Sequence, residues 1–201
     1  MLTVEADPAR VEIRLSAGEL ICPDCAGLLC RWGWARSRVL RDATGGLMAV
    51  RPRRTRCVSC GVSHVLLPVF ALVRRADMAE VIGAALAAKA TGAGVRVIAE
   101  RLGRPVETVR GWLRRFAARA ETVRRFFTVL LVDAGVDPAP PGTARTVFAD
   151  AVAAVVGAWW SMTSRWPAVG TVSPWLAACA VTGGILLAPA WPAKKINKSR
   201  P

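Results

Sequence analysis

The stretch that decides the fold is ADMAEVIGAALAAKATGAGVRVIAERLGRPVETVRGWLRRFAARA, residues 76–120. Apolar residues recur at helical spacing in three segments of it, and Asp77 has the side chain of a helix N-cap. Gly103 follows the second segment and Pro105 opens the third. Because glycine adopts a left-handed backbone at no steric cost and proline suits a first helical turn, these two residues mark a tight turn between helices. The sequence therefore predicts three short helices.

The third helix is expected to begin near Pro105 and to run from Val106 to about Arg119. Its spacing turns Val109 and Leu113 to one side, which gives an apolar seam for the interior. The opposite face carries Glu107, Thr108, Arg110, Gly111, Arg114 and Arg115. An amphipathic helix with a basic, hydrogen-bonding outer face follows from this pattern.

The same residues resemble the bacterial helix-turn-helix, whose pattern is an Ile-Ala pair, a Leu-Gly turn, then Thr-Val and an aromatic. The matching residues are Ile98-Ala99, Leu102-Gly103, Thr108-Val109 and Trp112. In that family the last helix enters the major groove of DNA. The resemblance places near the base edges Glu107, Thr108, Arg110 and Gly111, and near phosphates Arg96, Arg104, Arg114 and Arg115. The alternative is an ordinary three-helix bundle with a solvated basic face.

Charge points to a polyanionic partner. The 201 residues, room for one large domain or a few small ones, include 28 Lys and Arg against 14 Asp and Glu, for a net charge of +14. Hydrophobic residues make up 53%, which excludes global disorder. Arginine dominates the basic residues and suits bidentate contacts with phosphate and guanine. Double-stranded DNA is the favoured partner, although RNA or an anionic membrane surface also suits such charge.

Two Cys-x-x-Cys pairs form the strongest chemical signal, Cys22 with Cys25 and Cys57 with Cys60. Two thiolates three positions apart at a turn can face one ion, and a second pair completes a tetrahedral shell, so we predict a structural Zn²⁺ site. Cys30 and His64 remain as substitute ligands. Disulfides do not suit a chain without an export signal, and a redox pair normally occurs once, beside a βαβ pattern.

The segment between the cysteine pairs predicts a hairpin. Residues 28–39 and 47–56 are strand-like, 41–46 form their turn, and 63–67 form a return strand. Arginines and tryptophans interleave on the two arms, so we expect DNA contacts from Arg51, Arg53 and Arg54. The alternative is a solvated edge whose tryptophans cover a small core.

The cysteine pairs together with the helix-turn-helix resemble the N-terminal DNA-binding region of zinc-ribbon insertion-sequence transposases. They are also similar to a bacterial family of uncharacterised zinc-ribbon and helix-turn-helix proteins, over roughly residues 20–120. The resemblance implies a reader of DNA ends or operators. A DDE nuclease needs three carboxylates on a mixed α/β core. The carboxylates after Arg119 lie in helical or linker sequence, at Glu121, Asp133, Asp137 and Asp150. We therefore expect no enzymatic activity.

The domain organisation follows from these motifs and from composition. We expect an N-terminal extension at 1–19, a zinc ribbon at 20–72, a helix-turn-helix domain at 73–132, a Pro- and Gly-rich linker at 133–143, a C-terminal helical hairpin at 144–193 and a basic tail at 194–201. Residues 11–15 alternate like a short strand. The start of the chain lacks a signal-peptide pattern, which predicts a cytoplasmic, nucleoid-associated protein.

The C-terminal apolar run predicts a buried hairpin that offers a homodimerisation face. A membrane span is not expected, because prolines and glycines interrupt the run and its uninterrupted core is shorter than about 20 residues.

The predicted fold class is mainly α with a small β zinc ribbon, a central three-helix helix-turn-helix and a C-terminal helical pair. The predicted function is non-enzymatic, sequence-specific binding of duplex DNA, either in transcriptional control or at transposon ends. One alternative is a DNA-binding subunit or degenerate relative of a transposase that lacks its DDE domain. A further alternative is an RNA-binding zinc-ribbon protein.

Overall fold

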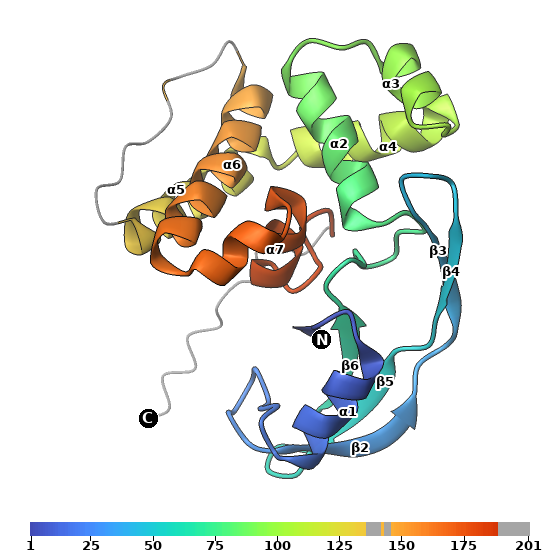
Figure 1. The fold of residues 1–201 in the computed structure, drawn as a ribbon, viewed down its shortest axis with the longest axis vertical. Helices are drawn as coiled ribbons and strands as arrows, with labels where there is room; N and C mark the ends of the chain where they lie inside the picture. Colours follow the sequence, from blue (N-terminus) through green and yellow to red (C-terminus); the bar gives the residue numbers. More distant parts are fainter. Residues whose placement is uncertain (136–141, 143–145, 189–201) are drawn as a thin grey trace.

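The computed structural model describes residues 1–135, 142 and 146–188. The N-terminal elements are β1 (Leu2–Val4), α1 (Pro8–Ser16), β2 (Leu29–Trp34), β3 (Arg38–Arg41), β4 (Leu47–Val50), β5 (Arg53–Cys57) and β6 (Ser63–Pro68). The elements that follow are α2 (Ala79–Ala90), α3 (Val95–Arg101), α4 (Val106–Ala117), α5 (Ala120–Ala134), α6 (Val147–Arg165), the 3₁₀ helix η1 (Pro167–Thr171) and α7 (Pro174–Val181). About half of this part of the chain is helical, and it also contains a small mixed sheet (Figure 1).

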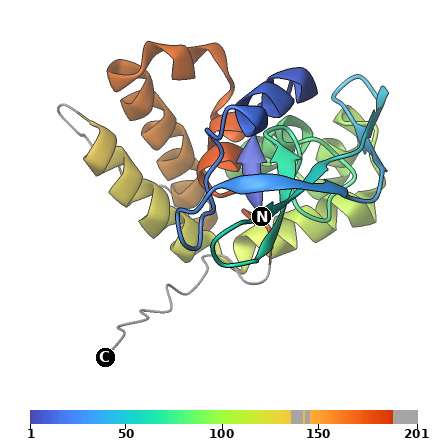
Figure 2. The same ribbon diagram turned by 90° about the horizontal axis from the view of Figure 1, so that it is seen from below.

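The N-terminal module, residues 1–68, is built on a four-stranded sheet in the order β1-β6-β5-β2. Strand β1 runs parallel to β6, with Leu2 opposite Leu66, and β5 is antiparallel to both of its neighbours. Helix α1 lies beside the strands (Figure 2). The first residues are therefore an integral part of the sheet, where an extension was expected.

The prediction of a strand at residues 11–15 is wrong, because these residues lie in α1. The Asp7 side chain accepts a hydrogen bond from the Ala9 amide at 2.9 Å, and Pro8 occupies the first turn. Val11 and Leu15, four residues apart, are buried on one helical face. The N-terminal cap and the i, i+4 spacing outweigh the alternation of the sequence.

The hairpin predicted between the cysteine pairs is confirmed. Strands β2 and β5 pair at its base, and β3 and β4 pair at its tip. The Asp42 carboxylate accepts hydrogen bonds from the Thr44 and Gly46 amides, both at 2.8 Å, which fixes the turn. The tip extends away from the sheet toward α2 and α4 (Figure 1).

Helices α2, α3 and α4 form the predicted three-helix unit. Gly103 has a φ of +59°, as the tight turn requires, and α4 begins at Val106. Val109 and Phe116 are fully buried and Trp112 nearly so, together with Ile98 from α3. The apolar seam of α4 therefore faces the interior, and the opposite face is left for solvent.

The C-terminal helices complete the same core. The largest set of helix contacts joins α5 to α6, and both α6 and α7 also contact α2. The ring of Trp175 in α7 lies so close to Gly83 in α2 that a Cβ atom at Gly83 would clash with it. Helices were expected in this part of the chain, and α6 and α7 contact each other as well as the helix-turn-helix. The predicted basic tail, residues 194–201, and most of the predicted linker lie outside the described residues.

Among the residues that the structure describes, one helix, α6, is long and apolar enough to cross a membrane by length and composition alone. Its residues Ala151, Val155 and Ala158 are fully or almost fully buried in the protein. A core helix passes the same test, so α6 gives weak support for a membrane segment.

Candidate metal centre and nucleic-acid interface

The four cysteines of the two pairs converge at one end of the N-terminal module. The Sγ atoms of Cys22 and Cys60 lie 3.8 Å apart, and those of Cys25 and Cys57 lie 3.4 Å apart. All four sulfur atoms lie within 4.8 Å of one another. A tetrahedral ion with metal–sulfur bonds of about 2.3 Å has sulfurs about 3.8 Å apart. The arrangement is compatible with a metal site.

Backbone hydrogen bonds shape each cysteine loop. The Cys22 amide donates to the Gly27 carbonyl at 2.8 Å, and the Cys57 amide donates to the Val62 carbonyl at 2.9 Å. A Cβ atom at Gly27 would stand 2.9 Å from the Cys57 sulfur, so a side chain there would push the second loop away. Gly61 has a φ of +72°, which glycine adopts without strain.

Backbone amides also prepare one thiol for metal binding. The Cys60 amide lowers the pKa of Cys57 to about 6, with a smaller contribution from the Ser59 amide, while burial acts in the opposite direction. Because the thiolate is the form that binds a metal, this shift favours the ligand state of Cys57 at neutral pH, whereas the pKa values of Cys60 in the same loop and of Cys25 are raised.

His64 and Cys30, the two substitute ligands, occupy different positions. The buried His64 ring has Nε2 at 3.3 Å from the Cys22 sulfur and Nδ1 at 3.2 Å from the Met1 amino group. Since the ammonium group donates to Nδ1, Nε2 carries the proton and donates to Cys22. Cys30 is exposed and its thiol donates to the Arg56 carbonyl at 3.2 Å, outside the cluster.

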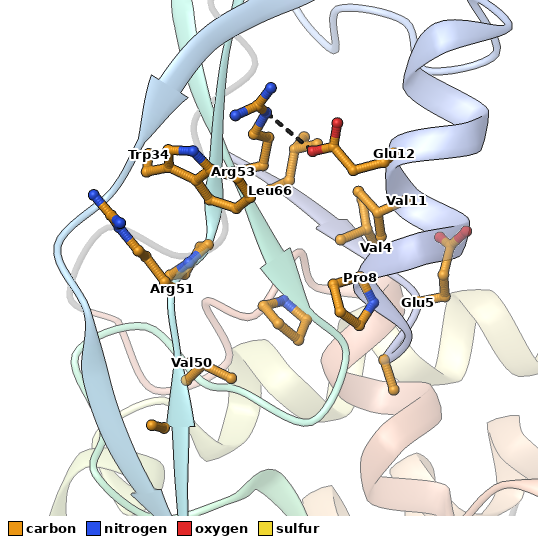
Figure 3. A pocket seen from close by; sticks show the side chains of 14 residues that line it. Val4, Glu5, Pro8, Val11, Glu12, Trp34, Val50, Arg51, Arg53 and Leu66 are labelled. Atoms are coloured by element: carbon orange, nitrogen blue, oxygen red, sulfur yellow. Dashed lines mark ion pairs between the residues drawn. The ribbon is translucent and has the colours of Figure 1, made fainter.

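The predicted interleaving of arginine and tryptophan is present on the hairpin, and part of it is internal. The Arg53 guanidinium lies 4.4 Å from the Trp34 ring centroid, and its Nε lies 3.0 Å from a Glu12 carboxylate oxygen (Figure 3). The two atoms are not aligned as a hydrogen bond, so the contact is an ion pair. Arg51 and Arg54 remain exposed. Both side chains present exposed positive charge on the hairpin, whereas Arg53 holds α1 to the hairpin.

The side chains around this ion pair line a cavity of about 190 Å³ between α1 and the hairpin. Its wall carries both charges of the ion pair and the apolar side chains of Val11 and Leu66 (Figure 3). Glu12 also pairs with Arg31 at 3.0 Å. Sequence reasoning missed Glu12, because the partners lie on strands distant in the chain.

The outer face of α4 carries the residues predicted to meet DNA. Glu107, Arg110 and Arg114 are exposed, and the Glu107 carboxylate pairs with Arg110 one turn along the helix. The Arg115 guanidinium donates to the Gly111 carbonyl at 2.9 Å, and a Cβ atom at Gly111 would meet it. Thr108 lies on this face, and the exposed Arg96 lies on α3.

Arg104 does not lie on this face, contrary to the expectation that it lies near phosphates. It is 8% exposed, and its Nε donates to the Asp77 carboxylate at 2.6 Å. Its Nη2 donates to the Asp42 carbonyl, also at 2.6 Å. Asp77 does not cap α2 either, because Met78 is the N-cap residue. A buried carboxylate requires a paired cation, and Arg104 supplies it.

The hairpin tip is joined to the helix-turn-helix by this ion pair and by backbone contacts. The Arg41 amide donates to the Ala76 carbonyl at 2.8 Å, and the Met78 amide donates to the Arg41 carbonyl at 3.0 Å. Leu40 is completely buried in the core of the helical part. The N-terminal module and the helices are therefore held in a fixed relation.

Sequence reasoning also missed a group of arginines beside α4. Burial lowers the pKa of Arg75, and the positive charges of Arg115 and Arg74 lower it further. The Arg75 Nε is buried without a hydrogen-bond partner. The Arg74-Arg75 pair was visible in the sequence. Helical periodicity does not show, however, that the loop before α2 brings this pair close to Arg115 of α4.

Comparison with protein families identifies the central region. Residues 75–124 match the model of the homeodomain-like domain, a match that spans α2, α3, α4 and the start of α5. The chain thus contains a helix-turn-helix DNA-binding domain, and the prediction of this domain is confirmed. Neither a curated protein nor a solved structure gives a significant match to the chain.

Proposed function

We propose that the protein binds duplex DNA in a sequence-specific manner by inserting α4 into the major groove. The observation that carries this proposal is the polar, basic face of α4 within a region that matches the homeodomain-like domain. The role is one of binding, in transcriptional control or at transposon ends, and no reaction is assigned to the chain. Such a protein acts at the nucleoid in the cytoplasm.

The contacts divide into base readout and phosphate binding. Arg110 lies in the second turn of α4, and its pairing with Glu107 orients the guanidinium for a bidentate contact with guanine. Thr108 and Gly111 allow the helix to approach the base edges. Arg96, Arg114 and Arg115 contact phosphates, and Arg75 extends this set because it lies near enough to Arg115 for the two positive charges to repel one another.

We infer that the metal of the cysteine cluster is a structural Zn²⁺ bound by four thiolates. The distances between the sulfur atoms suit a tetrahedral ion, and zinc is the usual ion of four-cysteine structural sites, although iron also binds four thiolates. Zinc would crosslink the two cysteine loops. His64 would orient Cys22 through its Nε2–H, in the way that outer hydrogen bonds fix metal ligands.

The N-terminal module is proposed to contact DNA next to the site of α4. Arg51 and Arg54 are exposed on the hairpin, whose tip is fixed to α2 and the turn before α4. Because hydrogen bonds and the Arg104–Asp77 ion pair join the two parts, both basic surfaces are proposed to act on one continuous site. Arg53, which pairs with Glu12, keeps its arm in position and makes no phosphate contact in this proposal.

The test is a competition between duplex DNA and single-stranded RNA of the same sequence, over a series of salt concentrations. We expect duplex DNA to bind more tightly, with the logarithm of the binding constant falling linearly with the logarithm of salt concentration. Preference for RNA would favour the RNA-binding alternative. Binding to neither polymer would overturn the proposal.

A further inference from the structure

Helix α5 carries an outward-facing apolar stripe that the proposed DNA-binding role does not use. One face of α5 is buried in the protein through Val123, Phe127 and Leu131. On another face, Val129 and Val132 are 59% and 47% exposed. An open groove on this side is lined by Thr122, Arg125, Phe126, Val129, Leu130 and Asp133. These residues recur at helical spacing, so they form one continuous stripe.

Opposite charges stand at equal distances from the centre of this stripe. Arg125 lies four residues before Val129, and Asp133 lies four residues after it. When two copies of α5 meet in antiparallel orientation around a two-fold axis at Val129, Arg125 of each copy faces Asp133 of the other. The stripe is thus complementary to itself, which is what a symmetric dimer interface requires. We propose that the α5 stripe is a homodimerisation surface occupied by a second copy of this chain.

Both charged groups are accessible for this pairing. The Arg125 Nε contacts the Glu121 carboxylate at 2.7 Å, yet the Arg125 side chain is 75% exposed. A guanidinium has five N–H donors, so its other edge can donate hydrogen bonds to a second carboxylate. Asp133 is exposed, and Arg165 donates a hydrogen bond to its backbone carbonyl, which leaves the carboxylate out of that contact. Glu121 is held by both Arg124 and Arg125, which lower its pKa to about 2, so it stays charged and bound within its own helix.

The α5 stripe suits a second copy of the chain better than α6 and α7 do. The homodimer face was expected at residues 144–193, but the buried side chains of α6 and α7 face the core of the same chain. The α5 stripe combines exposed valines with charges in the antiparallel arrangement that self-pairing needs. A helix of 15 residues is about 22 Å long, and a helix pair of this length buries less than the about 800 Å² per partner of a standard interface. The dimer is therefore expected to be weak in isolation.

The proposed dimer would set the distance between two DNA-binding domains, an inference that rests on the proposed function. Ala120, where α5 begins after α4, lies nine residues from Val129, or about 13 Å along the helix. Two copies of Ala120 would lie about 27 Å apart, which is close to the spacing of about 34 Å between half-sites one DNA turn apart. A symmetric DNA site follows if the dimer forms.

The test measures association of the full chain without DNA by sedimentation equilibrium, so its failure is distinct from failure of the DNA-binding proposal. Wild type is expected to approach twice the monomer mass as concentration rises. Arg125→Asp and Asp133→Arg each place like charges opposite one another, and each is expected to weaken association by about tenfold or more. Arg36→Asp, a charge reversal at an exposed residue of the N-terminal module, is the matched control and should dimerise like wild type.

One mixture and one double variant make the test specific to antiparallel self-pairing. An equimolar mixture of the Arg125→Asp and Asp133→Arg chains restores opposite charges at both contacts, so heterodimers should form with an affinity near that of wild type. The chain that carries both substitutions should dimerise with itself, which a parallel arrangement does not allow. Far-UV circular dichroism of every variant verifies that the helices are intact.

Several results would overturn the proposal. A wild-type chain that stays monomeric at all concentrations contradicts it, and so does a dimer that neither single substitution weakens. Failure of the folded single variants to associate when mixed also contradicts it. A chain that ends at residue 188 and dimerises, while the full chain does not, would show that the chain's own C-terminal segment occupies the stripe.

Discussion

The N-terminal module and the helical part are stabilised in different ways. The separate core of the module consists of eight buried residues, Val4, Val11, Leu15, Leu20, Cys22, Leu29, Cys57 and Leu66. Two of the eight are cysteines of the candidate metal site. The helical core consists of Leu40 and of residues from Leu67 to Leu187, and it includes large side chains such as Trp112, Phe116 and Phe127. The helical part can therefore be stable through apolar burial, whereas so small a module needs a crosslink such as a bound metal.

The boundary between these two cores does not follow the strands. Leu40, at the tip of the hairpin, belongs to the helical core, while the base of the same hairpin carries the cysteines. The tip should accordingly remain docked when the base loosens. Metal loss and helix destabilisation should thus be separable in experiment.

Removal of the metal has the largest expected effect. Structural zinc binding contributes about 10–16 kcal/mol to the folding of small metal-binding modules. Chelation or Cys57→Ala should therefore abolish hydrogen-exchange protection in β5 and β6 while the amides of α2 and α5 stay protected. Elemental analysis should give one zinc per chain. A zinc content near zero, or a zinc content that does not change in Cys57→Ala, would contradict the assignment of the four cysteines as ligands.

Arg104→Ala is expected to have the next largest effect. Removing this guanidinium leaves the buried Asp77 carboxylate with Arg41, whose Nε lies 3.7 Å away, as its paired cation, so the cost is at most about 3–5 kcal/mol. Urea unfolding of the helical part measures the loss. Arg96→Ala, at an exposed residue of α3, is the control and should change stability by less than about 0.5 kcal/mol. If Arg104→Ala reduced DNA affinity without loss of stability, Arg104 would have the phosphate-binding role that its burial argues against.

A smaller effect is expected from Gly83→Ala, which tests how closely α7 packs on α2. The added methyl group forces Trp175 to move, and overpacking of this kind costs about 1–3 kcal/mol. The melting temperature of the helical part should fall while metal content stays constant. Gly170→Ala serves as the control, because a Cβ atom there makes only ordinary van der Waals contact with Thr163. Equal melting temperatures for the two variants would mean that α7 is not anchored at Gly83.

The smallest effects belong to the exposed arginines of the hairpin. Arg51→Ala and Arg54→Ala should each reduce the salt dependence of DNA binding by about one unit in the log–log slope, with more loss of affinity at low salt. Arg53→Ala should instead loosen α1, because it removes the ion pair with Glu12. Affinity and slope that do not change in Arg51→Ala and Arg54→Ala would place the DNA contact on the helices alone.

The sequence predicted the features whose causes are local. Gly103 and Pro105 mark the turn between α3 and α4, and the spacing of Val109 and Leu113 defines the inward face of α4. The cysteine pairs likewise predicted their own convergence, since each pair turns within a few residues. Such signals depend on neighbours along the chain and are readable without the fold.

The features that were missed depend on distant residues. Arg104 contacts Asp77 and Asp42, which lie 27 and 62 residues away, and no local pattern indicates that an arginine next to a turn becomes buried. The contact of Trp175 with Gly83 is of the same kind. The fold decides which arginines are free to bind DNA, and a count of basic residues does not distinguish them.

The most direct test of the central claim is selection of bound sites from a random duplex pool, with wild type, Arg110→Ala and Arg115→Ala in parallel. Base readout by α4 predicts an enriched motif for wild type. Arg110→Ala should relax preference at one position at a cost of about 1–3 kcal/mol, while Arg115→Ala should keep the motif and bind all sequences more weakly. No enriched motif for wild type, or equal and sequence-independent losses in both variants, would contradict recognition through α4.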